Sequence, residues 1–352
     1  MDGMRRTLLR VMGVGAGLMP AVAWAERIRI LPGEPSAGGP ASGGPSGATA
    51  TGQVSPAFQR FVAGIRVGEA RAHGGLQVLW LYTTDAVEPL AVATLEEART
   101  RGHLLITERE QASVPDLVIE NRGKSYVLLL AGEILVGGKQ HRVLREDILL
   151  PPLSGPRAIG VYCVEQGRWE AGRKDFDAKG TFAAPGLRSR LMERADQGRV
   201  WAEVGKYAAR AAAPSPTSSY QAVYEQPEVK EHLKDVERAP AHRPPGGALG
   251  AAVFVGATLT GLDLFHEPGL FAREWPKLLR AHALEAYRRP PGPNPDERTL
   301  RARLELILGG ARRAEGSLRG NAGVGQLFEF HVEKGRGSAL VFEGRTLHAA
   351  IL

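Results

Sequence analysis

The stretch GGKQHRVLREDILLPP, from Gly137 to Pro152, places a dense group of polar side chains between apolar runs of strand length. It is soon followed by GVYCVEQGRW, from Gly160 to Trp169, which has the same mixture. Together they hold Lys139, Gln140, His141, Arg142, Arg145, Glu146, Asp147, Glu165, Gln166, Arg168 and Trp169. So many hydrogen-bonding groups beside Val, Ile and Leu indicate either a ligand site or a structural network of ion pairs. Both alternatives place these residues on strands and their connections.

Short strands are predicted on the N-terminal side of this stretch. LQVLWLYT, from Leu76 to Thr83, and SYVLLL, from Ser125 to Leu130, are apolar runs of strand length. Asn121-Arg122-Gly123 predicts a hairpin turn between LVIE and SYVLLL. One helix is predicted over TLEEARTRG, with Thr94 as its N-cap and Gly102 at its end.

Helices are predicted in the middle of the chain and strands again at its end. In EPGLFAREWPKLLRAHALEA an apolar stripe includes Trp275, Leu278 and Leu279, and Pro276 predicts a kink or the first turn of the helix. QLFEFHVE, SALVFEG and TLHAAIL have strand character. We therefore predict a single α+β domain over residues 56–352, in which N-terminal and C-terminal β-strands form a sheet-rich core and several helices are inserted between them.

Composition restricts the class of protein and its partners. The chain has 352 residues, 43% of them hydrophobic, so it can bury a substantial core. Its 45 Lys and Arg against 38 Asp and Glu give a formal charge of +7, but no basic run is long enough for a nucleic-acid arm, and no nucleic-acid partner is expected. Cys163 is the single cysteine and alternates with Ile159 and Val161, which predicts a buried, inert thiol.

The N-terminal 25 residues, MDGMRRTLLRVMGVGAGLMPAVAWA, predict a signal peptide that ends at Ala23-Trp24-Ala25. Arg5 and Arg6, followed by Leu-Leu-Arg, resemble a twin-arginine signal, and a general secretory signal is the alternative. Residues 26–55 are rich in Gly, Pro and Ser and predict a flexible tether. We therefore expect an exported protein, periplasmic or extracellular, with no membrane span in the mature chain.

Familiar catalytic motifs do not assign a reaction. The sequence has no dinucleotide fingerprint, Walker loop, His-Glu-x-x-His helix or nucleophile elbow. The nine histidines are dispersed without metal-ligand spacing, so no metal site is predicted, and the cofactor and any enzymatic activity stay unassigned. His331 and His348, on the final strands, are interpreted as ordinary strand residues.

The opening polar stretch supplies the candidate site. The candidate ligand-binding residues are Lys139, Gln140, Arg142, Gln166, Arg168, Trp169 and Glu133, and the candidate catalytic residue is Glu165. The three cations would hold phosphate or carboxylate oxygens, Trp169 would stack on a base or sugar, and Glu165 would act as a general base or grip ribose hydroxyls. Alternatively, Glu165 pairs with Arg142 or Arg168 across adjacent strands. An exposed, concave cluster would favour ligand binding, and a buried, mutually paired cluster would favour a structural role.

Several segments, in order, resemble a known family. AGEILVGGKQHRVL, CVEQGRW, QGRVW, VYEQPEVKEHL and GLDLFHEPGLFAREWPKLLRAHALEA resemble the first of the ARG and rhodanese-phosphatase-superfamily-associated protein domains, over about Pro56 to Leu352. At His141 the chain departs from the Asn of the Lys-Gln-Asn-Arg version. The resemblance implies a link to NAD or ADP-ribose metabolism, without an established activity.

Two functions from different classes follow. The first is an exported protein that binds or processes an ADP-ribose-like or NAD-like nucleotide, a sugar phosphate or a related anionic ligand. The second is a non-catalytic exported interaction domain that binds a protein or a cell-envelope polymer.

If the export signal is used, the mature chain begins at Glu26, which N-terminal sequencing of secreted protein would show. Replacing both Arg5 and Arg6 by Lys is expected to block export through the twin-arginine route and to spare export through the general route. Recovery of the full-length chain only from the cytoplasm, with Met1 retained, would contradict the export prediction.

Overall fold

The computed structural model describes residues 51–85, 88–109, 115–168, 174–290 and 292–352. The predicted signal peptide, most of the predicted tether and Trp169 lie outside these residues. In the described part of the chain, the largest sheet has nine antiparallel strands, in the order β1 (Thr51–Gln53), β15 (Glu315–Arg319), β16 (Gln326–Val332), β17 (Gly335–Phe342), β18 (Arg345–Ile351), β14 (Thr258–Phe265), β13 (Gly250–Val255), β3 (Leu76–Thr83) and β2 (Ile65–His73). The first strand thus begins inside the predicted tether.

Two smaller sheets hold the strands between β3 and the first long helices. A six-stranded antiparallel sheet has the order β12 (Phe176–Phe182), β8 (Glu133–Gly137), β9 (Arg142–Leu144), β11 (Gly155–Cys163), β6 (Asp116–Asn121) and β5 (Leu104–Glu108). Its edges meet, because Thr107 forms an antiparallel bridge with Asp175. A three-stranded sheet has the order β10 (Ile148–Leu150), β7 (Tyr126–Leu129) and β4 (Val92–Ala93).

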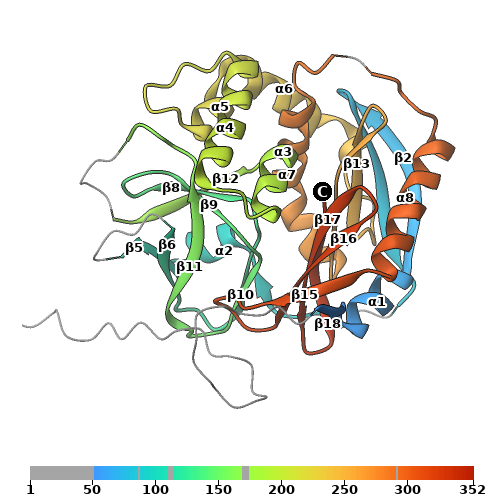
Figure 1. Cartoon of the computed structure of the whole chain (residues 1–352), viewed down its shortest axis with the longest axis horizontal. Coiled ribbons are helices and arrows are strands. Elements are labelled where there is room, and N and C mark those ends of the chain that lie inside the picture. Colours follow the sequence, from blue (N-terminus) through green and yellow to red (C-terminus); the bar gives the residue numbers. More distant parts are fainter. Residues whose placement is uncertain (1–50, 86–87, 110–114, 169–173, 291) are drawn as a thin grey trace, which may run out of the picture.

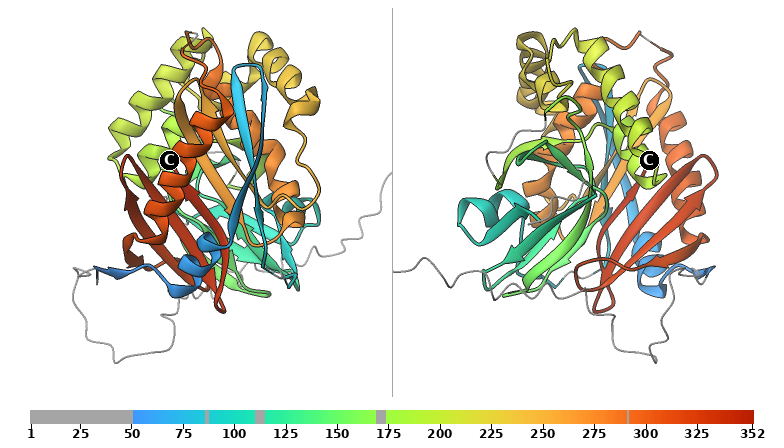
Figure 2. Two further views of the ribbon diagram at one scale, coloured as in Figure 1. Left: turned by 90° about the vertical axis from the view of Figure 1, so that its right-hand side faces the viewer. Right: turned by 60° about the vertical axis from the view of Figure 1, so that its left-hand side comes forward.

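Helices lie on both faces of the nine-stranded sheet (Figure 1). The helices are α1 (Pro56–Ala63), α2 (Leu95–Thr100), α3 (Pro185–Met192), α4 (Gln197–Ala211), α5 (Tyr220–Glu225), α6 (Pro227–Arg238), α7 (Pro268–Ala286) and α8 (Glu297–Arg312), with a short 3-10 turn at Pro240–His242. Helices α1 and α8 pack on one face, and α3 and α7 pack on the face toward the six-stranded sheet (Figure 2). Among the described residues, we find no helix with the length and hydropathy needed to cross a membrane.

The apolar run in β3 shows why the sheet is covered on both sides. Leu79 and Leu81 belong to the core under α1 and α8, whereas Val78 and Trp80 belong to the core that contains α7. The Trp80 ring lies 5.2 Å from that of Trp275, centroid to centroid. Alternate side chains of a strand point to opposite faces, so a strand buried on both faces needs a continuous apolar run.

The predicted α+β organisation is confirmed. The early strands β2 and β3 and the late strands β15–β18 share one sheet, joined through β13 and β14. The predicted helix start is also confirmed, because Thr94 and Glu97 form a reciprocal capping box at the start of α2. Cys163 is fully buried, as predicted, and burial raises the pKa of its thiol.

The hairpin predicted at Asn121-Arg122-Gly123 is wrong. Strand β6 pairs with β5 and β11, whereas β7 pairs with β10 and β4, so this turn connects two different sheets. The Asn121 side chain accepts from Gly123 N and donates to the carbonyls of Ser125 and Pro151 at 2.9 and 2.8 Å. It therefore turns the chain out of the first sheet, and the local signal alone does not distinguish this from a hairpin.

For Pro276 the sequence predicted a kink or the first turn of the helix, and the second alternative is wrong, because α7 begins at Pro268 and continues through Pro276 to Ala286. Trp275, Leu278 and Leu279 are buried, which confirms the apolar stripe.

Leu279→Ala is expected to reduce the free energy of unfolding by roughly 2–5 kcal/mol, because it removes a buried side chain between α7 and the sheet. Equilibrium denaturation checks this, with Leu306→Ala, at an exposed position of α8, as the control. Equal stability of the two variants would mean that α7 is not packed as described.

Candidate functional site

The predicted site residues on the β11–β12 side form ion pairs with one another. Arg168 Nη2 lies 2.8 Å from Glu165 Oε2, and the guanidinium also donates to the carbonyls of Gly138 and Gly137 at 2.8 and 3.2 Å. Glu165 accepts further hydrogen bonds from Thr217 Oγ1, at 2.7 Å, and from the backbone N–H of His141, at 3.1 Å. The donors of Arg168 are therefore directed at the protein itself.

Arg142 lies inside the six-stranded sheet and is fully buried. Its Nη1 donates to the Gln140 carbonyl at 2.9 Å, and its Nη2 lies 3.6 Å from Glu108 Oε1. The Gln140 amide in turn donates to the Gln166 carbonyl at 3.1 Å. An arginine in this position stabilises the strands and is shielded from a ligand in solvent.

The charge state of Glu165 fits a structural carboxylate. Burial raises the pKa of Glu165, but hydrogen bonds from Arg168 and Thr217 outweigh burial and hold the pKa below its ordinary value. His141 Nδ1 lies 3.0 Å from Ser219 Oγ and 3.6 Å from Glu165 Oε2. Because both contacts involve the same ring nitrogen, His141 does not link serine and carboxylate as a catalytic triad would.

The remaining predicted residues are not brought together by this cluster. Lys139 is half-buried, and its backbone N–H donates to Glu108 Oε1 at 3.0 Å. Gln166 is exposed, and Glu133 lies apart, in the interior between the sheets. Of the two alternatives for the opening stretch, the described cluster has the buried, mutually paired geometry.

A second set of charged side chains lies on the face of the nine-stranded sheet that packs against α3. His348 on β18 is fully buried, with Nδ1 at 2.6 Å from Asp147 Oδ2 and Nε2 at 3.2 Å from Asp263 Oδ1. Arg188 on α3 binds both carboxylate oxygens of Asp263, at 2.7 and 3.0 Å. Asp147 also accepts the backbone N–H of Ala131 at 2.8 Å. The Asp147 network is thus a chain of alternating charges formed by Arg188, Asp263, His348 and Asp147.

The environment decides the protonation of this network. Burial alone would lower the pKa of His348, but the carboxylates of Asp147 and Asp263 outweigh burial and raise it to about 9. Burial likewise raises the pKa of Asp263, and Arg188 and His348 reverse this and hold the pKa far below its ordinary value. At neutral pH these shifts favour an ionised Asp263 and a protonated His348.

A neighbouring network surrounds Lys277 on α7. Its ammonium contacts Glu133, lies 2.6 Å from Glu274 Oε2 and lies 3.0 Å from Glu96 Oε2. Burial raises the pKa of both Glu133 and Glu274. The Phe182 ring separates the two networks, with Arg188 Cζ at 5.1 Å and Lys277 Nζ at 5.9 Å from its centroid.

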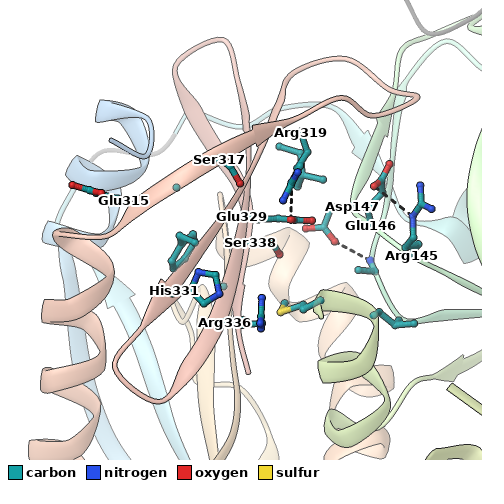
Figure 3. A pocket seen from close by; sticks show the side chains of 17 residues that line it. Arg145, Glu146, Asp147, Glu315, Ser317, Arg319, Glu329, His331, Arg336 and Ser338 are labelled. Atoms are coloured by element: carbon teal, nitrogen blue, oxygen red, sulfur yellow. Dashed lines mark hydrogen bonds and ion pairs between the residues drawn. The ribbon is translucent and has the colours of Figure 1, made fainter. Parts of the chain in front are cut away.

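Asp147 also borders a cavity of about 260 Å³ (Figure 3). The cavity is lined by Ala131, Arg145, Glu146, Asp147, Leu191, Met192, Glu315, Gly316, Ser317, Arg319, Leu327, Glu329, Phe330, His331, Arg336, Gly337 and Ser338. The side chains labelled in Figure 3 come from β15–β17 and from the loop before β10, whereas Leu191 and Met192 come from α3. The cavity therefore brings exposed side chains such as Arg336 and the buried carboxylate of Asp147 to one space.

Three arginines stand in the cavity wall. Arg319 is paired with Glu329 at 2.8 Å, and Arg145 Nε lies 3.9 Å from Glu146 Oε2. Arg336 is exposed, and within the described residues its guanidinium has no carboxylate partner. Its backbone is fixed by reciprocal hydrogen bonds with Leu352, at 3.0 and 2.9 Å. The wall therefore presents one cation to the cavity without an internal counter-charge.

Sequence reasoning missed this site, although parts of it carried a signal. Asp147 belongs to the polar stretch Gly137–Pro152 but is not among the predicted site residues. His348 stands between apolar residues in TLHAAIL, and a histidine on the buried face of a central strand needs polar partners. Those partners, Asp263 and Asp147, come from distant segments, so the pattern alone does not reveal them.

Residues 64–352 match the family described as the ARG and Rhodanese-Phosphatase-superfamily-associated Protein domain. The match includes both charged networks and the whole cavity lining. Comparison with curated proteins and with solved structures gives no match. The resemblance inferred from the sequence is confirmed, with a boundary at residue 64.

The structure predicts that the opening stretch has a structural role in stability. Arg142→Gln is expected to reduce the free energy of unfolding by about 3–5 kcal/mol, because it leaves buried Glu108 without its cation. Arg168→Gln is expected to reduce it by about 1.5–3 kcal/mol, through loss of charge-assisted hydrogen bonds.

Denaturant titration measures both changes, and Arg122→Gln serves as the control, because Arg122 forms an exposed pair with Glu120 that contributes at most about 1 kcal/mol. A stability loss for Arg168→Gln no larger than that of the control would contradict the structural role.

Proposed function

The chain belongs to the family of ARG and Rhodanese-Phosphatase-superfamily-associated Protein domains, and we propose that it binds a small anionic ligand in the cavity beside Asp147. The proposed ligand carries hydroxyl groups and belongs to the sugar-phosphate class. The observation that carries the proposal is that Arg336 and Asp147 border one cavity. A cation without an internal partner and a buried carboxylate suit an anion and a hydroxyl of the same molecule.

The cations of the wall support the anionic part. A guanidinium presents paired N–H donors that match phosphate or carboxylate oxygens, and Arg336 has no competing carboxylate among the described residues. Arg145 and Arg319 stand in the same wall and add positive potential to it. The lining also holds the carboxylates Glu146, Asp147, Glu315 and Glu329, one more than its arginines. This balance favours a ligand that combines one anionic group, placed at Arg336, with neutral polar groups over a polyanion.

The size of the cavity supports a sugar phosphate. At about 260 Å³ it is slightly smaller than typical pockets for drug-sized ligands, which are roughly 300–1,000 Å³. A ribose phosphate suits this space, whereas a whole dinucleotide would extend beyond its mouth. ADP-ribose and NAD contain ribose phosphate groups, so such nucleotides are the larger members of the proposed ligand class.

The proposed ligand is encountered outside the cytoplasm. This part of the proposal depends on the predicted signal at residues 1–25, with its Arg5-Arg6 pair and its Ala23-Trp24-Ala25 cleavage site. A periplasmic or extracellular sugar phosphate or nucleotide fits both the cavity and the predicted route.

An exported non-catalytic interaction domain is the second candidate. The observation that favours it is the internal pairing of Arg168 with Glu165 and of Arg142 with Glu108, which engages two of the predicted anion ligands within the protein. In that case the binding surface for a protein or envelope polymer would lie elsewhere.

Ribose 5-phosphate is expected to bind the folded protein in a calorimetric titration, and Arg336→Gln is expected to weaken this binding by at least about tenfold, the effect of one charge-assisted hydrogen bond. The control is Arg298→Gln, at an exposed arginine in the first turn of α8, outside the cavity.

ADP-ribose and inorganic phosphate are titrated in parallel to define the size of the ligand. Equal affinity of Arg336→Gln and the wild type would contradict the assigned role of the cavity. Failure of all three probes to bind the wild type would favour the interaction domain.

A further inference from the structure

We infer that His348 is a specificity-determining residue. It lies behind Asp147 as an imidazolium and keeps that carboxylate a hydrogen-bond acceptor toward the cavity. The cavity therefore selects ligands that have a hydroxyl donor beside the anionic group. The inference rests on the proposed function, because it concerns the same cavity. It adds a residue that does not line the cavity and a rule for the ligand.

The hydrogen count on the imidazole supports the charged form. Nδ1 faces Asp147 Oδ2 at 2.6 Å, and Nε2 faces Asp263 Oδ1 at 3.2 Å. Arg188 donates to both oxygens of Asp263, so Asp263 is ionised and has no proton to offer. Nε2 of His348 therefore meets an acceptor and must carry a proton. An imidazolium carries a second proton on Nδ1, which it donates to Asp147 across the 2.6 Å contact.

The same contacts determine what Asp147 offers to a ligand. Oδ2 accepts from His348, and Oδ1 accepts from the backbone N–H of Ala131 at 2.8 Å. An ionised carboxylate has further lone pairs but no proton, so its cavity side accepts hydrogen bonds and does not donate them. A ligand with a hydroxyl at this point adds a charge-assisted hydrogen bond to Asp147, which a ligand without the hydroxyl does not form.

The surroundings fix the pH range of this arrangement. The charged groups that face His348 are Asp147 from the loop before β10, Asp263 from β14, Arg188 from α3 through Asp263, and Glu274 from α7. The pKa of His348 is about 9 in the folded protein against an ordinary value of 6.5. Protonated His348 therefore contributes its full amount to the free energy of unfolding below about pH 6.5, and this contribution is lost as the pH rises through about 9.

The charge state is measured directly by ¹⁵N chemical shifts of the His348 ring between pH 6 and 10, assigned by comparison with His348→Gln. Two protonated nitrogens are expected at pH 7, with deprotonation near pH 9. A neutral imidazole at pH 7 would overturn the inference without any reference to a ligand.

Selectivity is measured as the ratio of affinities for ribose 5-phosphate and inorganic phosphate. In Asp147→Asn and His348→Gln, this ratio is expected to fall by at least about tenfold, through ribose 5-phosphate alone. The matched control is His73→Gln, which removes an exposed histidine that pairs with Asp235 at 2.9 Å.

Thermal unfolding and circular dichroism establish that each variant is folded. Asp147→Asn preserves shape, so it tests the inference even where His348→Gln unfolds. An unchanged ratio in folded Asp147→Asn would overturn the inference. If neither probe binds the wild type, the proposed function is wrong. If both probes bind and the ratio of their affinities is the same in the variants as in the wild type, only the inferred role of His348 and Asp147 in selectivity is wrong.

Discussion

Charged side chains in an interior without water need partners of opposite charge close by, and this requirement determines the packing between the two large sheets. The buried charged groups there are Asp147, Asp263, Glu133, Glu274, Arg188, Lys277 and His348. They come from α3, α7, the six-stranded sheet and its outgoing loop, and the nine-stranded sheet. Any shift of α3 or α7 along the sheets would separate a cation from its carboxylate, so the networks determine how these helices are positioned.

The turn between β7 and β8 couples the two networks. Ala131 donates its N–H to Asp147, and two residues later Glu133 contacts Lys277. Between them Gly132 has a φ of 108°, and a Cβ there would lie 3.1 Å from Arg188 Cγ and from the Phe182 ring. A glycine is therefore needed where the chain passes between the two cations. The cavity carboxylate and the structural ammonium thus depend on a single short segment.

Local patterns predicted those parts of the fold that local physics decides. The apolar run of β3 predicted a strand, and Thr94 as an N-cap predicted the start of α2. The turn at Asn121 was misassigned, because the same side-chain bonds serve a hairpin and a crossing between sheets. For Glu165 and Arg168 the residue types left a site and a scaffold equally open, and only their distances and burial distinguish the two. His348 was passed over because its partners are set by strand order, which the alternation of apolar residues does not encode.

The position of β18 has a consequence for how the protein matures. This strand lies inside the nine-stranded sheet, between β17 and β14, yet it follows every other strand along the chain. In a nascent chain that has emerged only as far as β17, the strand edges of β17 and β14 that bind β18 are therefore unpaired. The carboxylates of Asp147 and Asp263 also lack their contact with His348. The pairing of β18 with β14 is non-local, and because such pairing is slow, the sheet is expected to close late in folding, after an intermediate with unpaired strand edges.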